Sequence, residues 1–283
     1  MHLGRFTYKG RESIGLISEG MVTDIGDRFR AFHEVIDKTG PGWHDLALLE
    51  AVGPAVPLND VILKPALDPD RTVFALAANY RKHAEEAGVG VPDHPVVFTK
   101  PESACVGSGE TIVLPKISTK MDYEGELAAV VGRTARSVSA ADAAEYIAGY
   151  TIVNDLTARD LQWTNLGQHR IVDWLSSKML DRTTPVGPWV VSAEHVTDPH
   201  RLQLRTRLNG QLMQDSSTEF MVFSIWEIVE YLSARVTLRS GDIIATGTPF
   251  GVGGFREIFL KAGDTVEVEI EQIGTLHNRV EAP

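Results

Sequence analysis

Short apolar runs bounded by glycine, proline and aspartate make up most of the chain beyond residue 70, a pattern typical of β-strands. We expect six of these runs to be strands, at residues 96–99, 126–131, 150–154, 189–192, 243–246 and 265–270. A further alternating run, from Leu202 to Leu208, ends at Asn209-Gly210. That dipeptide is a strong hairpin signal because both residues tolerate a positive φ angle. The pattern therefore predicts a protein built mainly of β-sheet.

Helical periodicity is weaker and marks two segments. Apolar residues between Val222 and Leu232 recur at helical spacing, which predicts an amphipathic helix. We expect a second helix over residues 139–147, with Ser139 as its N-cap. Because strands and helices do not alternate regularly, the pattern favours an α+β fold with a folded-over mixed sheet over a doubly wound one.

Prolines and aspartates at residues 65–70 interrupt the periodic segments and indicate a division of the chain. We interpret residues 1–69 as a small N-terminal domain, with short strands at 15–17 and 21–25 and a short helix at 45–52. Residues 70–283 would then form the larger domain. A length of 283 residues is compatible with one large and one small unit.

The composition is ordinary for a soluble globular protein, with 43% apolar and 23% charged residues. A net charge of −11 argues against binding to nucleic acid or an anionic membrane, although a local basic pocket for an acidic substrate is compatible with it. Cys105 is the only cysteine, so we expect neither a disulfide framework nor a thiolate zinc cluster, and a reducing cytoplasm fits. We find no signal peptide and no apolar run of about 20 residues, so we expect no membrane span.

Two glutamates one residue apart, Glu124 and Glu126, stand at the start of a run that is apolar on both faces. Side chains alternate along a strand, so both carboxylates point to the same face, roughly 7 Å apart. A run that is apolar on both faces predicts a strand covered from both sides, where unpaired carboxylates would be costly. A bound divalent cation would offset that cost, so the pair predicts half of a metal site.

Asp155 follows an expected strand and is the candidate third ligand, although a lone aspartate at a strand end usually closes a turn. Thr157 and Asp160 have the spacing of a capping box, so we expect a helix to begin there. That helix would bring Arg159 and Gln162 toward Asp155. Three carboxylates with no cysteine or histidine among them suit Mg²⁺, Mn²⁺ or Ca²⁺ better than Zn²⁺.

His83 and Glu86 are three residues apart, which places them on one helical turn. A carboxylate beside an imidazole holds its tautomer and stabilises the protonated ring, so the pair is either a general base or a solvated surface pair. Lys178 follows an apolar, aromatic stretch and is a candidate buried lysine, although such side chains more often reach water. The glycine-rich segment 240–253 has no helix after it and no Walker-type lysine, so it does not predict a nucleotide site.

Taken in order, these segments resemble the fumarylacetoacetate hydrolase family of metal-dependent hydrolases, decarboxylases and isomerases of oxo acids. The resemblance covers roughly residues 70 to 283. The motifs that carry it are Asn79-Tyr80-x-x-His83, Tyr123-Glu124-x-Glu126-Leu127, Asn154-Asp155-x-Thr157-Ala158-Arg159-Asp160-x-Gln162, Lys178-x-x-Asp181, Pro185-x-Gly187-Pro188 and Gly241-Asp242-Ile243-Ile244-x-Thr246-Gly247-Thr248-Pro249. One departure is Met179-Leu180 after Lys178, where many members carry Ser-Phe, so substrate identity does not transfer directly.

The resemblance implies a mixed β-roll or sandwich catalytic fold of the fumarylacetoacetate hydrolase type, behind a small N-terminal domain and usually within a homodimer. It implies Mg²⁺ or Mn²⁺, with Ca²⁺ as an alternative. The site residues that it implies are Glu124, Glu126 and Asp155 as metal ligands, His83, Glu86 and Lys178 as catalytic groups, and Tyr80, Arg159, Gln162 and Thr248 as substrate contacts.

The expected function is hydrolysis of a C–C bond in a 2,4-dioxo acid, an acylpyruvate or a fumarylacetoacetate-like substrate, through a metal-bound enolate. The small-molecule substrate would chelate the ion while His83 and Glu86 activate water, in the catabolism of aromatic or sugar acids. Oxaloacetate decarboxylation, or isomerisation or hydration of an unsaturated 2-oxo acid, would use the same site without the hydrolytic water and stays open. A non-catalytic protein with an enclosed structural Ca²⁺ is a third alternative.

Overall fold

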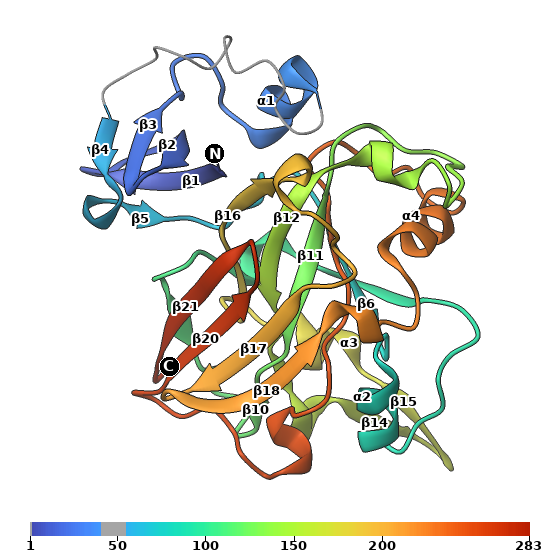
Figure 1. The fold of residues 1–283 in the computed structure, drawn as a ribbon. Coiled ribbons are helices and arrows are strands. Elements are labelled where there is room, and N and C mark those ends of the chain that lie inside the picture. The colour runs from blue at the N-terminus through green and yellow to red at the C-terminus, as the bar shows by residue number, and fades with distance from the viewer. Residues whose placement is uncertain (1, 41–54) are drawn as a thin grey trace.

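Two large β-sheets dominate the fold of the described residues, 2–40 and 55–283, in the computed structural model (Figure 1). Beyond residue 70 the larger sheet contains β6 (Val73–Ala77), β7 (Val96–Lys100), β8 (Cys105–Val106), β11 (Gly125–Val131), β12 (Ile147–Asn154), β16 (Thr184–Ser192) and β19 (Ile243–Ala245). β11 pairs antiparallel with β12 and β19, and β12 pairs with β16. The strands expected in this region are therefore confirmed, with their ends shifted by a few residues.

The second sheet, orange and red in Figure 1 apart from β9, packs against β11, β12 and β16. Its strands are β9 (Thr111–Val113), β17 (Gln203–Leu208), β18 (Gln211–Ser217), β20 (Thr265–Ile270) and β21 (Gly274–Glu281). β17 and β18 form the predicted hairpin, in which Asn209 and Gly210 have φ angles of 52° and 78°. The turn requires this left-handed conformation at both positions. The strand expected at 265–270 coincides with β20.

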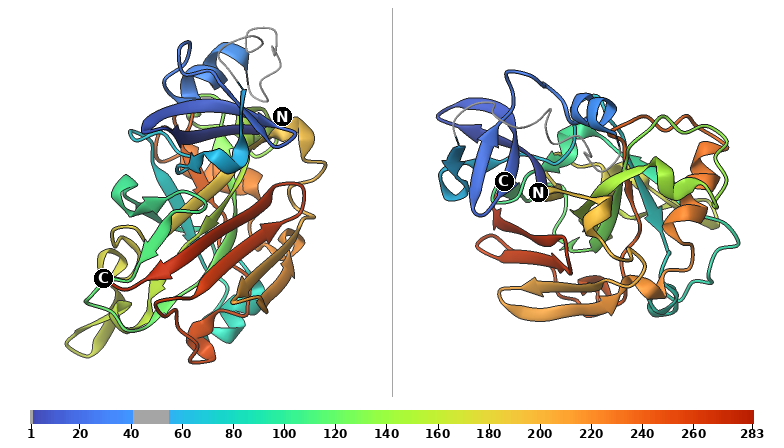
Figure 2. Two further views of the ribbon diagram at one scale, coloured as in Figure 1. Left: turned by 90° about the vertical axis from the view of Figure 1, so that its left-hand side faces the viewer. Right: turned by 45° about the horizontal axis from the view of Figure 1, so that its top comes forward.

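The leading residues extend the larger sheet at one end of the molecule (Figure 2). They form β1 (His2–Tyr8), β2 (Arg11–Ser18), β3 (Met21–Asp24), α1 (Phe32–Thr39), β4 (Ala55–Pro57) and β5 (Ile62–Leu63). The strands expected at 15–17 and 21–25 lie in β2 and β3, whereas the helix expected at 45–52 lies outside the described residues. β1 pairs with β16, so the boundary at residue 69 crosses one continuous sheet and stays a prediction.

β11 is buried along its whole length, as its apolar run predicts. Leu127 and Ala129 on one face pack in a core cluster with the second sheet. Ala128 and Val130 on the other face pack in a cluster that includes Phe32 of α1. Because both faces are covered by protein, a charged side chain at the start of β11 has no access to bulk water.

The helices are short: α2 (Arg81–Glu86), α3 (Trp174–Lys178) and α4 (Ile225–Ser233). α4 confirms the amphipathic helix expected from the periodicity, and Ser224 and Glu227 form its capping box. The helix expected over 139–147 is wrong, because the segment forms one 3₁₀ turn, Ala143–Tyr146, before β12 begins. Ser139 binds the carboxylate of Asp142 at 2.6 Å and caps no α-helix. Pairing of β12 with β11 outweighs the weak local preference for helix.

The helix expected to begin at Thr157 is also wrong. Thr157–Ala158 is strand β13, which pairs with β10 (Met121–Asp122). A 3₁₀ turn, Arg159–Leu161, leads into the hairpin β14 (Trp163–Leu166) and β15 (His169–Val172). Asp160 does not close a capping box, because its carboxylate accepts hydrogen bonds from Ser118 and Thr119. Other 3₁₀ turns cover Leu58–Asp60, Glu102–Ala104, Ala193–His195, Thr218–Phe220 and Gly253–Phe255.

The expected fold class is confirmed, because mixed sheets dominate the chain and helices are few. Within the described residues, no helix has both the length and the apolar character that crossing a bilayer requires.

Candidate active site

Strand pairing brings the three predicted metal ligands together. Gly125 of β11 pairs with Asn154 of β12, and one residue further the Asp155 amide donates to the Glu124 carbonyl at 2.9 Å. Asp155 is therefore the direct neighbour of Glu124. Carboxylate oxygens of Glu124, Glu126 and Asp155 all lie within 4.8 Å of one another, and all three residues are buried. The convergence predicted from the sequence is present in the structure.

Gly125 allows the second sheet to approach between the two glutamates. A Cβ atom at this position would lie 2.4 Å from Oγ1 of Thr206 and 2.8 Å from Cγ1 of Val268. The Gly125 amide donates to Oε1 of Gln214 at 3.0 Å, and Gln214 in turn donates to the hydroxyl of Thr248 at 2.8 Å. The backbone that carries both glutamates is thus held by side chains of the second sheet and the loop after β19.

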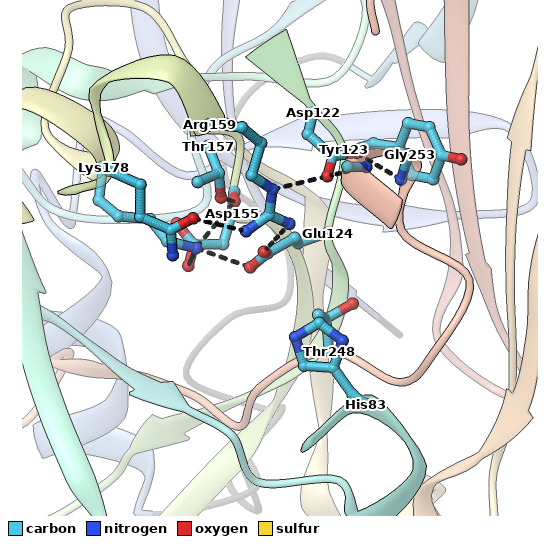
Figure 3. Close-up of polar contacts among 12 residues, drawn as sticks. His83, Asp122, Tyr123, Glu124, Asp155, Thr157, Arg159, Lys178, Thr248 and Gly253 are labelled. Atoms are coloured by element: carbon cyan, nitrogen blue, oxygen red, sulfur yellow. Dashed lines mark hydrogen bonds and ion pairs between the residues drawn. The ribbon is translucent and has the colours of Figure 1, made fainter. Parts of the chain in front are cut away.

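Buried cations surround the carboxylates (Figure 3). Nζ of Lys178 lies 2.6 Å from oxygens of both Glu124 and Asp155. Arg159 bridges Glu124, at 2.5 Å, and the buried Asp122, at 2.8 Å. Of the two alternatives that the sequence left open for Lys178, the structure has the buried one, since this residue is only 4% exposed.

Two members of this network, Lys100 and Asp122, were not identified from the sequence. Lys100 ends β7 and forms an ion pair with Asp155, and both side chains are fully buried. Asp122 accepts hydrogen bonds from Arg159 and from the amides of Gly253 and Gly254. The available signal for Lys100 was its position two residues after Phe98, on the same face of an apolar strand.

The two glutamates have opposite pKa shifts. Burial raises the pKa of the Glu124 carboxyl, but the charges of Lys178 and Arg159 outweigh burial and hold it below its usual range. Burial, together with the neighbouring charges of Asp155 and Glu124, raises the pKa of Glu126 well above its usual range. One oxygen of Glu126 accepts from the Gly247 amide at 2.8 Å, whereas the other has no hydrogen-bond partner among the described residues. Glu126 is therefore the carboxylate that most needs a further cation.

A divalent ion fits this donor set. The described buried charges at the cluster are the carboxylates of Asp122, Glu124, Glu126 and Asp155 and the cations Lys100, Arg159 and Lys178. If all of these groups are ionised, four negative and three positive charges leave a net charge of −1. A divalent cation would change this net charge to +1. A substrate carboxylate would then bring the centre to neutrality. Oxygen-only ligands favour Mg²⁺, Mn²⁺ or Ca²⁺.

His83 and Glu86 face each other on α2, as expected from their spacing, with Nδ1 of His83 3.5 Å from Oε2 of Glu86. This distance is longer than that of a hydrogen bond. The Gly251 amide donates to Glu86 at 3.1 Å and holds the carboxylate in place. Tyr80, just before α2, is buried near Glu126, and burial together with that carboxylate raises the pKa of the Tyr80 phenol. Within the described parts of the chain, 2–40 and 55–283, its hydroxyl has no hydrogen-bond partner.

A cavity of about 360 Å³ opens above the carboxylate cluster. Its polar lining consists of His83, Glu124, Arg159, Gln162, Lys178 and Thr248. Arg159 and Gln162 are brought together as expected, with Nη1 of Arg159 3.5 Å from Oε1 of Gln162, but by a 3₁₀ turn rather than a helix. Tyr80, Glu86, Glu126 and Asp155, by contrast, are not among the lining residues. The hydroxyl of Thr248 already donates to the Gly125 carbonyl at 2.9 Å.

Curated relatives match most of the chain. The chain is 43% identical over 230 residues to oxaloacetate tautomerase FAHD2B, mitochondrial, of Bos taurus, covering 80% of this chain and 72% of that protein. It is also 43% identical over 221 residues to oxaloacetate tautomerase YisK of Bacillus subtilis, covering 76% of this chain and 71% of that protein.

Solved structures of similar fold include enzymes named for different reactions. A 5-carboxymethyl-2-hydroxymuconate delta-isomerase from Mycobacterium smegmatis aligns with a TM-score of 0.80 and 36% identity over 100% of both chains. A maleylpyruvate hydrolase from Sphingobium sp. SYK-6, in complex with manganese (II) ion and pyruvate, aligns with a TM-score of 0.80 and 28% identity over 100% of this chain and 99% of that one. The model of the fumarylacetoacetate (FAA) hydrolase C-terminal domain matches residues 72–281. With this match over most of its length, the chain belongs to the fumarylacetoacetate hydrolase family.

Proposed function

We propose that the protein is a divalent-metal-dependent hydrolase that cleaves a C–C bond in a 2,4-dioxo acid of the acylpyruvate type. One observation carries this proposal: the oxygens of three buried carboxylates converge within 4.8 Å, and one of the three, Glu124, lines a cavity together with His83, Arg159 and Gln162. A cavity of this size lies within the usual range for small-molecule sites. The pairing of a metal site with a potential base is the arrangement that hydrolysis requires.

Glu124, Glu126 and Asp155 would hold Mg²⁺ or Mn²⁺. When bound, the ion supplies Lewis-acid stabilisation of negative charge on the 2-oxo oxygen of the substrate. Lys178 orients the ligands Glu124 and Asp155, because it contacts both at 2.6 Å. Lys100 does the same for Asp155 from the other side. These lysines also offset the repulsion between carboxylates that must lie close together.

His83 would act as the general base. Its ring lines the cavity, and its Nδ1 faces the carboxylate of Glu86. This leaves Nε2 to remove a proton from the water that attacks the distal carbonyl carbon, while Glu86 stabilises the imidazolium. Breakage of the C–C bond then leaves a carboxylic acid and an enolate of pyruvate, to which the imidazolium can return a proton.

Arg159 and Gln162 would orient the substrate. The Arg159 guanidinium is anchored by Asp122 and Glu124, so its position is fixed before the substrate arrives. Gln162 lies beside it and can donate to a carboxylate or carbonyl oxygen through its amide. Thr248 and Tyr80 would contribute by shaping the floor, since the Thr248 hydroxyl binds Gly125 and Tyr80 is packed against the Glu126 side.

A second candidate is enol–keto tautomerisation of oxaloacetate. It is favoured by two relatives at 43% identity that are named oxaloacetate tautomerases. Proton transfer between carbon and oxygen would use the same carboxylate cluster and a base, without attack by water. Decarboxylation of oxaloacetate or isomerisation of an unsaturated 2-oxo acid would also need no attacking water.

Product analysis separates these reactions. The purified protein with Mg²⁺ or Mn²⁺ is incubated with acetylpyruvate, and loss of the enol absorbance is compared with the formation of pyruvate and acetate. Equal molar amounts of both products support hydrolysis. A parallel incubation uses oxaloacetate as the substrate. If the oxaloacetate enol is lost without formation of pyruvate, and acetylpyruvate stays intact, the reaction is tautomerisation and the hydrolase proposal fails. Light scattering on the same sample tests the further proposal that the protein is a homodimer.

A further inference from the structure

The cavity changes character from its floor to its rim. The floor residues Glu124, Lys178 and Thr248 are polar and at most 5% exposed. Two apolar side chains of the lining, Trp163 and Phe255, are by contrast 43% and 48% exposed and so belong to the rim. Exposed apolar side chains around a cavity mark a surface that a ligand covers on binding.

The wall between floor and rim is aromatic. Phe98 and Trp174 stack with ring centroids 4.6 Å apart and an interplanar angle of 10°. Nζ of Lys178 lies 5.4 Å from the Phe98 ring centroid, so this wall begins directly at the charged floor. A flat apolar group that extended from the floor would lie against it.

Among the described residues that line the cavity, none supplies an unpaired lysine or arginine at the apolar end. Among the residues that line it, the basic side chains are His83, Arg159 and Lys178. Arg159 and Lys178 each contact two carboxylates at the floor. Two cations of the described chain approach aromatic rings nearby, but neither lines the cavity: Lys82 over Phe250 and Arg170 over Trp163.

We infer that the acyl group of the substrate is apolar and uncharged, and that the protein selects aryl or extended alkyl acylpyruvates over 2,4-dioxo acids that end in a second carboxylate. This inference rests on the proposed function and names its substrate class. The dioxo acid head would occupy the charged floor, and the acyl group would lie between the Phe98–Trp174 wall and the rim. A terminal carboxylate there would lose part of its hydration against the apolar side chains and would find no unpaired cation among the lining residues, which disfavours binding.

A matched set of acids tests the selection: benzoylpyruvate, its para-carboxy derivative and acetylpyruvate. With Mn²⁺ present, we expect benzoylpyruvate to bind at least about tenfold more tightly than acetylpyruvate, because the ring buries additional apolar surface. We expect the para-carboxy derivative to bind about 100-fold more weakly than benzoylpyruvate. Dissociation constants are measured by calorimetry on the His83→Ala variant, which lacks the proposed base but keeps the cavity floor.

Two phenylalanines provide a matched pair of variants. Phe255 and Phe220 are 48% and 49% exposed and both lie in 3₁₀ turns, but only Phe255 lines the cavity. Phe255→Ala should weaken benzoylpyruvate binding about fivefold and leave acetylpyruvate binding unchanged. Phe220→Ala should change neither.

The outcomes separate the inference from the proposed function. If benzoylpyruvate is preferred in binding but no acid is hydrolysed by the wild-type protein, the acyl-group selectivity stands and the hydrolase proposal fails. Equal or tighter binding of the para-carboxy derivative would overturn the selectivity, whatever the reaction. An equal loss in the Phe255→Ala and Phe220→Ala variants would also overturn it.

Discussion

The two ends of the cavity are built in different ways. At the floor, each charged side chain contacts at least one partner of opposite charge or a backbone amide, and the participating residues come from β7, β11, the end of β12 and α3. At the rim, Phe255 and Trp163 are half exposed. A substitution at the floor should therefore alter both the stability of the fold and the catalytic activity. A substitution at the rim should alter mainly which substrate binds.

Glu126→Gln should have the largest effect. The amide keeps an acceptor for the Gly247 amide but removes a charge that a metal needs, so we expect metal-dependent turnover to fall about 1,000-fold or more. Thermal unfolding is the second measurement: Mn²⁺ should raise the Tm of the wild type but not of the variant. The exposed Glu145→Gln is the control. Undiminished stabilisation by Mn²⁺ in Glu126→Gln would remove this residue from the ligand set.

His83→Ala should reduce hydrolysis by about 100-fold or more, since a positioned base commonly contributes that much. Metal binding should be retained, because the histidine is not one of the three clustered ligands. Steady-state kinetics and Mn²⁺ titration measure the two effects separately. His94→Ala, which alters a histidine stacked on Tyr231, is the control. Full hydrolytic activity in His83→Ala would exclude the base role.

Lys100→Met tests whether the stability of the cavity floor depends on Lys100, which was not identified from the sequence. Removing one partner of a buried ion pair is strongly destabilising, and Lys178 still contacts Asp155, so we expect a loss of about 3 kcal/mol in the free energy of unfolding. Mn²⁺ should restore part of the loss. Urea denaturation without and with Mn²⁺ measures the loss in the free energy of unfolding and the part of it that the ion restores. The exposed Lys116→Met is the control. A variant as stable as the wild type would contradict the proposed support.

Metal affinity should depend on pH through Glu126. Its raised pKa means that the metal-free carboxyl holds a proton to higher pH than usual, and the ion must displace that proton. The apparent affinity for Mn²⁺ should therefore rise by up to about tenfold per pH unit below this pKa and level off above it. Calorimetry in two buffers of different ionisation heat measures the released proton. Binding with no proton release from about pH 5 to 8 would contradict the shift.

Val89→Arg should have the smallest effect and act only on substrate choice. An arginine at this 46% exposed lining position would face a terminal carboxylate, and we expect kcat/KM for the para-carboxy acid to rise a few fold. Added salt should cancel the gain because the pair is solvent-exposed. Val236→Arg, at a 41% exposed position outside the cavity lining, is the matched control. A similar gain in both variants would indicate a nonspecific charge effect.

Local sequence patterns correctly predicted the features that depend only on residues close together in the chain. The alternation before Asn209-Gly210 specified a hairpin, and the spacing of Glu124 and Glu126 placed two carboxylates together. The errors arise where distant pairing decides. Residues 139–147 and the segment from Thr157 carry weak helical signals, but β12 and β13 are fixed by strands from elsewhere.

Lys100 and Asp122 were not predicted as site residues for the same physical reason, because their contacts are distant in the sequence. Lys100 is 55 residues from Asp155, and Asp122 is 37 residues from Arg159. A lysine at the end of a strand is usually solvated, so nothing local distinguishes this one. Only the packing of β7 close to the end of β12 turns it into part of the floor.

The pairing of β1 with β16 has a consequence for any shortened version of the protein. A fragment limited to the family-matched residues 72–281 would keep β16 but lose the strand that hydrogen-bonds to its outer side. Unsatisfied backbone donors and the apolar surface now covered by Leu3 and Phe32 would then meet solvent. Such a fragment would expose a sheet edge at which another copy could pair, and in the whole protein the leading residues cover that edge.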